Sequence, residues 1–204
     1  VITFSWQKVL GGEAAHGIIV LSPKAIEHLE KFTPSWPIPK IFRLTKSKKV
    51  IEGVFKGETL NTPSMLCVED YLDALKWVRE IGGLEACIKR ANDSFNFIND
   101  WVSNSSSIDF LCQEVSNRSN TSVCLKFKDD RVINQAEDTQ RSLAKEIGVL
   151  LEDEGVALDI VNHRSAPPGL RIWTGATVEP TDVRDLLPWI DWAYNQAFNK
   201  IIGR

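Results

Sequence analysis

The sequence predicts an α/β fold in which a small sheet carries helices on one of its faces. Apolar residues recur at three- and four-residue steps over residues 84–102, which is typical of a long helix with one buried face. After residue 107, short runs rich in β-branched and aromatic residues alternate with further helical stripes. That alternation indicates an open α/β sandwich in the second half of the chain.

The first third of the chain predicts short elements. Two strands are expected on either side of a glycine-rich turn near the start, and residues 25–29 predict one or two amphipathic helical turns. Three prolines within residues 34–39 predict a rigid, extended crossing, because proline fixes φ and lacks the N–H that a helix or central strand needs. Residues 40–60 are expected to form a surface loop or a short hairpin.

Two helices are expected next. Ser64 follows Pro63 and can cap a helix that the glycine pair Gly82-Gly83 ends. The second helix is the stripe over residues 84–102, and a serine-rich polar run ends it. Beyond it we expect, in order, strands at 108–112 and 121–127, a helix around 143–151, strands at 156–161 and 170–174, and a helical stretch from 181. Pro188 predicts a break in that last stretch.

Composition narrows the classes of function. The chain has 204 residues, 43% apolar and 25% charged, which is typical of a soluble globular protein. Its net charge of −3 argues against nucleic acid or an anionic membrane as a general partner. No apolar run approaches the roughly 20 residues of a membrane span, and no leader resembles a signal peptide. Four widely spaced cysteines without a CxxC pair predict reduced thiols in a cytoplasmic protein, and no residues stand at metal-ligand spacing.

Lys8 is the first candidate for a catalytic or cofactor-binding residue. It stands between the two predicted strands, directly before the glycine pair Gly11-Gly12, so it is held close to the backbone with few side chains around it. A bulky bound cofactor requires such a setting. The simpler interpretation of this segment alone is a solvated loop lysine.

Two further groups of residues suit anions. Asn61 and Thr62 stand just before a predicted helix, whose free N–H groups and dipole favour a phosphate, although the same residues also suit a plain capping turn. His163 and Arg164 end one predicted strand and Arg171 starts the next. If these strands pair, the three side chains would lie close together at one edge of the sheet. Guanidinium groups bind carboxylates and phosphates at two points, so these three residues suit a small anionic substrate. The alternative is that each arginine is paired with an acidic neighbour.

Together these segments resemble the phosphoserine aminotransferases, in particular the type found in alphaproteobacteria and methanogenic archaea. The resemblance covers essentially all 204 residues. The segments that carry it are Ser5-Trp6-Gln7-Lys8 with Gly11 to Gly17, Trp36 to Arg43, Gly57 to Met65, Arg118 to Val123, and His163-Arg164 to Arg171-Ile172-Trp173.

The resemblance implies a pyridoxal-phosphate transferase of the aspartate aminotransferase fold (fold type I), working as a homodimer. Residues 1–82 would be the second half of the cofactor-binding large domain. Residues 83–204 would be the small carboxyl-terminal domain, beginning with a long interdomain helix. Because the chain opens on Val1 and family members run to nearly twice its length, we expect a fragment that lacks the amino-terminal half and is inactive by itself.

The resemblance also assigns roles around the cofactor. Lys8 would bind pyridoxal 5'-phosphate covalently through its amine and carry a proton between substrate and cofactor. Gln7 would contact the cofactor phosphate. Asn61 and Thr62 would reach across the dimer to the phosphate of the partner's cofactor.

The substrate side follows in the same way. His163 and Arg164 would grip the substrate's phosphate or side-chain carboxylate, and Arg171 would hold its α-carboxylate. The implied reaction of serine biosynthesis transfers an amino group between glutamate and 3-phosphohydroxypyruvate, giving O-phosphoserine and 2-oxoglutarate. Whether a substrate of pyridoxine biosynthesis is also used stays open. The stretch Pro167-Pro168 departs from the glycine-rich version of other branches, which puts the aim of Arg171 in doubt.

Two alternatives stay open. One is another transaminase of the same superfamily, of the alanine- or serine-glyoxylate type, whose substrates carry no phosphate; His163 and Arg164 argue against it. The other is a non-catalytic module that keeps the fold. The absent first half favours that module. The residues that argue against it are Lys8, Asn61, Thr62 and Arg171.

Overall fold

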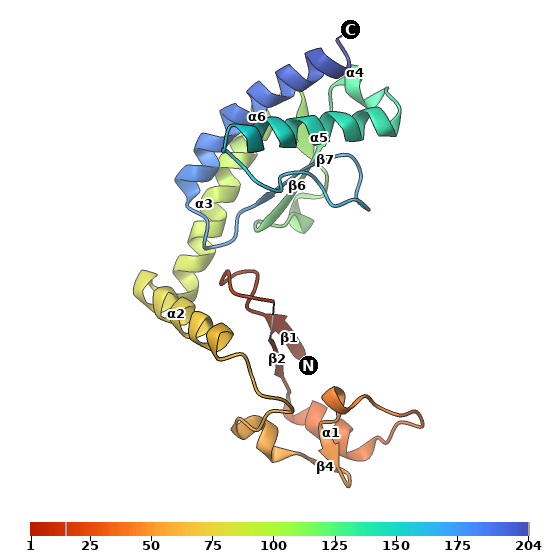
Figure 1. Cartoon of the computed structure of the whole chain (residues 1–204), viewed down its shortest axis with the longest axis vertical. Coiled ribbons are helices and arrows are strands. Elements are labelled where there is room, and N and C mark those ends of the chain that lie inside the picture. Colours follow the sequence, from red (N-terminus) through yellow and green to blue (C-terminus); the bar gives the residue numbers. More distant parts are fainter. Residues whose placement is uncertain (15, 204) are drawn as a thin grey trace. The chain divides into compact units, whose positions relative to one another are not determined.

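The structure is a computed structural model that describes residues 1–14 and 16–203. The chain divides into two compact units, Val1–Trp77 and Val78–Arg204, and the division falls within helix α2 (Met65–Ile81) (Figure 1). The roles given above to residues 1–82 and 83–204 stay predictions. In the described residues, no helix has both the length and the apolar character to cross a membrane.

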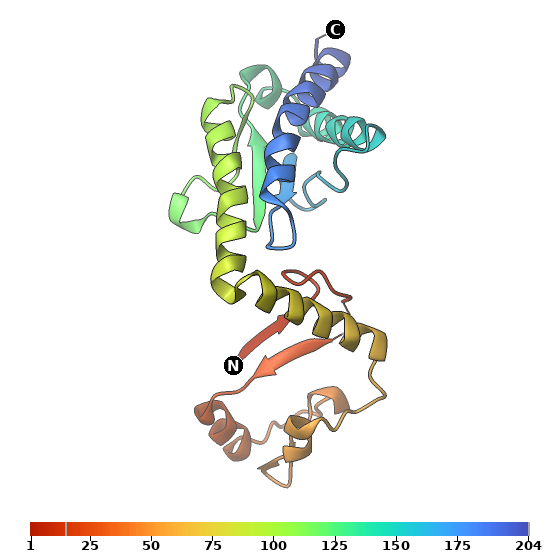
Figure 2. The ribbon, with the colours of Figure 1, turned by 90° about the vertical axis from the view of Figure 1, so that its left-hand side faces the viewer.

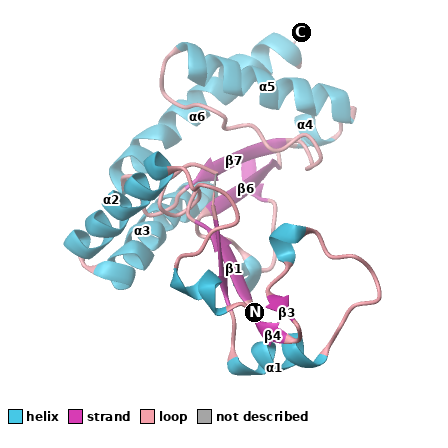
Figure 3. Ribbon diagram, turned by 60° about the horizontal axis from the view of Figure 1, so that its bottom comes forward, coloured by secondary structure: helices cyan, strands magenta, loops and turns pink. Residues whose placement is uncertain are grey.

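The first unit is built from short elements and long loops (Figure 3). Strands β1 (Ile2–Ser5) and β2 (Gly17–Val20) form an antiparallel pair on either side of the Lys8 turn, as predicted. Helix α1 (Pro23–Lys31) begins at Ser22, whose Oγ accepts a hydrogen bond from the amide of Ala25 at 3.2 Å. The hairpin expected within residues 40–60 is β3 (Thr45–Lys46) with β4 (Lys49–Val50), flanked by the 3₁₀ turns Lys40–Phe42 and Glu52–Lys56.

The second unit begins in the last turn of α2 and continues with α3 (Gly83–Asn104), the long helix that the apolar stripe predicts (Figure 2). Its sheet is antiparallel in the order β5-β6-β7, formed by Ile108–Phe110, Ser122–Phe127 and Gly169–Trp173. Between these strands lie a 3₁₀ turn (Val115–Asn117), α4 (Asp130–Ile133) and α5 (Glu137–Asp153). The last element is α6 (Pro180–Ile201).

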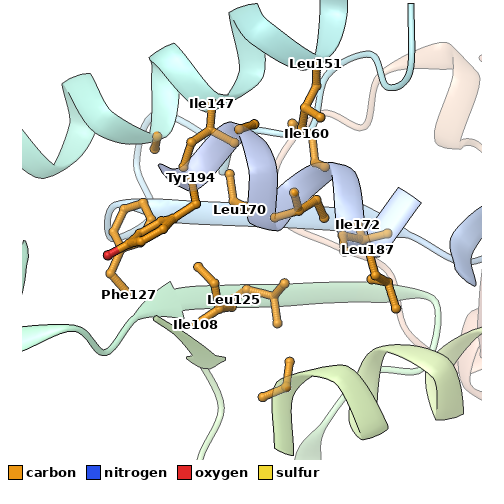
Figure 4. Packing of buried hydrophobic residues seen from close by; sticks show 14 of the residues in the cluster. Ile108, Leu125, Phe127, Ile147, Leu151, Ile160, Leu170, Ile172, Leu187 and Tyr194 are labelled. Atoms are coloured by element: carbon orange, nitrogen blue, oxygen red, sulfur yellow. The ribbon is translucent and has the colours of Figure 1, made fainter. Parts of the chain in front are cut away.

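The core of this unit lies between the sheet and helices α3, α5 and α6 (Figure 4). Along β6, Val123, Leu125 and Phe127 are buried, whereas the residues between them are half-buried on the opposite face. Leu125 is fully buried and belongs to the same apolar cluster as Ile147 of α5 and Ile190 of α6, which are fully buried as well. The alternate buried residues of the strand and the apolar stripes of the helices therefore meet in one apolar layer.

The prediction of a strand at residues 156–161 is wrong. Within this segment only Val161 forms a bridge, to Leu170, and the rest is irregular. The reason is local: Asp159 has φ of 52°, in the left-handed region, which interrupts an extended backbone. This segment contacts the edge of β7 through that bridge and through one hydrogen bond, from the amide of Arg171 to the carbonyl of Ile160 (2.7 Å).

The predicted break at Pro188 is also wrong, because α6 is one helix with Pro188 in its interior. A proline there removes one backbone hydrogen bond and normally costs about 3 kcal/mol. Pro188 lies on the exposed side, while Leu187 and Ile190 are buried on the other side of the helix. The apolar contacts of that buried side hold the helix together across the proline.

Candidate active site

Lys8 lies in the turn that follows β1. The amide of Gly11 donates to the carbonyl of Lys8 at 3.3 Å, and the amide of Gly12 donates to the carbonyl of Trp6 at 3.4 Å. Gly11 has φ of 68°, a left-handed conformation that glycine adopts without steric cost. These backbone bonds close the turn, and the side chain of Lys8 is exposed.

Trp6 anchors this turn. Only 6% of its surface is exposed, and its ring stacks on Tyr71 of α2 with 4.2 Å between the ring centroids. The ring of His16 also contacts Trp6, with 5.1 Å between the two ring centroids. A Cβ on Gly12 would stand only 2.8 Å from Cδ1 of Trp6, so the close approach of backbone and ring requires glycine at that position. The turn is thus held between α2 and the start of β2.

A hollow of about 470 Å³ opens beside Lys8. Gln7, Lys8, Gly11, Gly12 and Asp70 are among the residues that line it. Within the described residues Lys8 has no ion-pair or hydrogen-bond partner for its amine, which leaves that amine available to a ligand in the hollow.

The sequence did not indicate Asp70 or Tyr71 as neighbours of Lys8. Tyr71 could have been found, because it belongs to the apolar stripe of the predicted helix and therefore faces inward. Asp70 had no comparable signal, since an acidic residue in the second turn of a helix is ordinarily solvated. Both reach the site because α2 packs along the turn through Trp6.

Asn61 and Thr62 lie in the same unit, just before α2, and both are exposed. The predicted cap is present: Ser64 accepts at Oγ from the amide of Cys67 (3.5 Å) and at its carbonyl from the amide of Val68 (3.2 Å). Neither Asn61 nor Thr62 lines the hollow beside Lys8. The structure therefore brings Gln7 and Lys8 together and leaves Asn61 and Thr62 on a separate, solvent-facing segment.

In the second unit, His163 and Arg164 lie in a loop, residues 163–168, that leads into β7. The amide of Asn162 donates to the carbonyl of Gly169 at 3.1 Å and closes the base of the loop. The amide of Ala166 donates to the carbonyl of His163 at 2.8 Å and turns the chain inside it. His163 and Arg164 are both exposed, and among the described residues the guanidinium of Arg164 has no partner.

Two side chains outside the loop hold it in place. Arg141 of α5 donates to the carbonyl oxygens of Arg164 (3.5 Å) and Ala166 (3.1 Å), and its own orientation is fixed by Glu137, with 3.0 Å between Nε and Oε1. The side-chain amide of Asn162 donates from Nδ2 to the backbone carbonyls of Leu125 and Pro167, each at 3.2 Å. Sequence reasoning missed both. The contacts of Arg141 with the loop and of Asn162 with Leu125 join residues 23 or more positions apart and leave no local signal.

Arg171 lies within β7, opposite Cys124 of β6. Its Nη2 donates to Oδ2 of Asp159 at 2.9 Å, and 33% of the arginine side chain and 85% of the aspartate side chain are exposed. An exposed pair of this kind contributes little and can be exchanged for another carboxylate. Within the described residues, no hydrogen bond joins Arg171 to His163 or Arg164.

The part of the chain that the structure describes offers no metal site, because no three or more of its His, Cys, Asp or Glu side chains are grouped so that they could hold a metal ion. All four cysteines are free, with Cys67 and Cys87 buried.

The sequence of the chain has close relatives among known proteins. No family model matches the sequence. Over 195 residues, 96% of its length, the chain is 51% identical to the phosphoserine aminotransferase of Methanosarcina barkeri (strain Fusaro / DSM 804). It is 49% identical over the same share to the enzyme of that name from Methanosarcina mazei. The chain spans about half the length of these curated relatives, 50% in each case.

Solved structures agree. The phosphoserine aminotransferase from Bacillus circulans subsp. alkalophilus superposes with a TM-score of 0.57 at 24% identity, over 70% of this chain and 36% of that one. A phosphoserine aminotransferase studied for radiation damage of its Schiff base gives 0.59 at 17% identity, over 78% and 40%. At these identities the likeness shows the fold alone. The chain has part of the fold of these enzymes, the predicted fold class is confirmed, and so is the resemblance to the phosphoserine aminotransferases.

Proposed function

We propose that this chain is the lysine-bearing part of a phosphoserine aminotransferase, the enzyme that exchanges an amino group between glutamate and 3-phosphohydroxypyruvate. The observation that carries the proposal is the exposed amine of Lys8, which has no partner among residues 1–14 and 16–203 and lies on a small-residue turn beside a hollow. Similarity of about 50% identity to two enzymes of that name supports it over almost the whole chain.

The residues around Lys8 fit pyridoxal 5'-phosphate. Gly11 and Gly12 leave room beside the amine, and the side-chain amide of Gln7 can donate to a phosphate. Asp70 also lines the hollow, and its carboxylate would repel a phosphate, which favours the Gln7 side for that group. Asn61 and Thr62 would serve a cofactor phosphate held by the partner subunit.

The cofactor, when bound, supplies the electron sink for the reaction. Lys8 supplies the reversible covalent attachment and then an amine that takes and returns a proton at the substrate's Cα. The Trp6 stack and the backbone bonds of Gly11 and Gly12 define the backbone of the turn from which the Lys8 side chain extends, so the amine starts from a defined position beside the hollow.

The substrate's anionic groups would be held by the second unit. Arg171 would exchange its exposed carboxylate partner, Asp159, for the substrate's α-carboxylate. His163 and Arg164 project from an anchored loop, with the Arg164 guanidinium free of partners in the described part of the chain, and would take the phosphate or the second carboxylate. This pair favours a phosphorylated substrate over those of the glyoxylate enzymes.

The proposal includes an assembly. The complete enzyme would be a cytoplasmic homodimer whose active sites also use the remaining half of the polypeptide. The relatives' greater length supports the need for that half, because 204 residues account for about half of them. Nucleic acid and membrane have no part in this proposal.

The direct test is chemical labelling of Lys8. The complete polypeptide should bind pyridoxal phosphate and turn yellow, and borohydride should fix the cofactor to the peptide containing Lys8. Lys8→Met should abolish labelling and turnover, whereas Lys46→Met, which removes another exposed lysine, should change neither. Label recovered on another peptide, or a colourless protein indifferent to the cofactor, overturns the proposal.

A second measurement separates phosphoserine from glyoxylate enzymes. Arg164→Ala should lower kcat/KM for phosphoserine by a factor that corresponds to about 2–3 kcal/mol, because a charge-assisted contact is lost, and should affect serine much less. Equal losses for the two substrates would assign the chain to the glyoxylate type instead.

A further inference from the structure

Ser165 makes two contacts to one atom of its neighbour in the anchored loop. Its backbone amide lies 3.3 Å from Nδ1 of His163 and is oriented to donate to it. Its hydroxyl lies 2.7 Å from the same nitrogen. Both groups of Ser165 therefore converge on one side of the imidazole ring.

The two contacts together favour one tautomer of the ring. A backbone N–H can only donate, so Nδ1 accepts and does not carry the proton of the neutral imidazole while this contact is made. The hydroxyl can rotate to donate as well. The proton of the neutral ring then stands on Nε2, for which the described residues offer no partner, and His163 presents an N–H donor to solvent without needing a positive charge.

The same loop gives this donor a fixed position. Arg141 holds the carbonyls of Arg164 and Ala166, so the backbone on which His163 and Arg164 stand is fixed from α5. An anion that binds this loop would meet the Nε2–H of His163, whose ring is already oriented by Ser165, and could also recruit the exposed guanidinium of Arg164, which has no partner among the described residues.

We propose that Ser165 is a positioning residue that keeps His163 in the Nε2–H tautomer, and so makes the loop selective for the phosphate of the substrate. This inference rests on the proposed function for the identity of the anion, but not for the state of the ring. Ser165 acts through His163 and does not itself contact the substrate.

The first test reads the ring directly. Nitrogen-15 NMR of the 204-residue chain, at a pH where the imidazole is neutral, should show His163 protonated at Nε2 and unprotonated at Nδ1. Ser165→Ala should raise the population with the proton on Nδ1, because one of the two donors to Nδ1 is gone. Ser142→Ala, which removes a hydroxyl bonded to the Asp138 carbonyl on α5, should leave the His163 signals unchanged. A wild-type ring protonated at Nδ1, or a spectrum that Ser165→Ala does not alter, overturns the inference.

The second test uses the complete enzyme with its cofactor. Ser165→Ala should raise KM for phosphoserine about fivefold, as expected for one lost hydrogen bond, with kcat nearly unchanged and little effect on serine. Ser165→Thr, which keeps the hydroxyl, should restore most of the affinity. Unchanged KM, or equal changes for both substrates, contradicts the role in selectivity. If the tautomer changes as expected but the enzyme processes no phosphorylated substrate, the proposed function has failed and the positioning of the ring has not.

Discussion

The two units of this chain differ in how much of their apolar surface they bury themselves. In the second unit, apolar side chains from the sheet and from helices α3, α5 and α6 form one core, and many of them are fully buried. Among the described residues of the first unit, only Trp6 and Cys67 are buried apolar residues, while Phe4, Ile19 and Trp36 are about half exposed or more. Stability thus resides mainly in the second unit, although the proposed cofactor lysine is in the first.

This difference has a physical consequence for the Lys8 turn. Burial of apolar surface is the dominant favourable contribution to folding, so a unit with two buried apolar residues among those described gains little from its own contacts. The Trp6–Tyr71 stack and the backbone bonds of Gly11 and Gly12 define the shape of the turn. They do not by themselves make that shape long-lived.

Hydrogen exchange should show the contrast most strongly. In the 204-residue chain, amides of β6, α5 and α6 should exchange on the order of a thousandfold more slowly than those of β1 and β2, because opening them requires exposure of the core. Mass spectrometry of exchanged peptides measures this. Equal protection in the two units would mean that the first unit is stabilised by contacts that the burial pattern does not reveal.

A matched pair of substitutions sharpens the comparison. Ile147 is fully buried in α5, whereas 48% of Ile19 in β2 is exposed. Ile147→Ala should cost about 2–5 kcal/mol of unfolding free energy, since it removes apolar contacts and leaves a cavity. Ile19→Ala should cost less than about 1 kcal/mol. Urea unfolding followed by circular dichroism measures both, and a similar loss for the two variants would contradict the assignment of the core.

Acid should weaken the second unit through Asp129. Its carboxylate accepts from Arg131 and from the hydroxyl of Tyr194 at 2.9 Å, and the hydrogen bond from Arg131 is the main reason why the pKa of Asp129 is lowered to about 2. A lowered pKa means that the stabilisation is complete above about pH 4 and is lost as the pH falls through about 2.

The expected loss is about 2 kcal/mol, because 9% of the Asp129 side chain is exposed and solvent screens it only partly. Unfolding free energies of the wild type and of Asp129→Asn, compared between pH 5 and pH 2, measure it. The variant should be less stable at pH 5 and should show a smaller decline over this range. Parallel curves for the two proteins would show that Asp129 is not the titrating group.

A smaller effect than that of Asp129 is expected at the Lys8 turn. Gly12→Ala places a Cβ at 2.8 Å from Cδ1 of Trp6 and should displace the ring, at a cost of about 1–2 kcal/mol. Gly17→Ala is the control, because its Cβ would meet nothing closer than 3.9 Å. Near-ultraviolet circular dichroism of the Trp6 environment should change in the first variant only. A change of the same size in both would indicate a general loss of the β1–β2 pair.

Elements with a strong period could be predicted from the sequence. The apolar stripe over residues 84–102 predicted α3, and the strand expected at 121–127 corresponds to β6. The irregular segment around Asp159 and the unbroken α6 could not be predicted, because each depends on tertiary contacts or on one residue's φ that override local preference.

The candidate site divides in the same way. A lysine before two glycines, and a histidine beside an arginine, are visible in the sequence as residue types in a suitable order. The contacts that fix them come from elsewhere: Tyr71 from α2 on Trp6, and Arg141 from α5 on the loop of His163. Ser165 is a near neighbour in sequence, but its contact with Nδ1 of His163 depends on a ring orientation that no sequence pattern records.

The base of residues 163–168 is built more rigidly than its tip. Asn162 binds Leu125 and Pro167 through its side chain and Gly169 through its amide, and a Cβ on Gly169 would lie only 2.1 Å from the carbonyl oxygen of Leu125. These two end positions therefore tolerate little change, whereas the six residues between them are attached to the sheet chiefly at their ends and through Arg141. The segment has the properties of an exchangeable cassette, so grafting a different six-residue sequence between Asn162 and Gly169 offers a route to new acceptor preferences while the scaffold below stays intact.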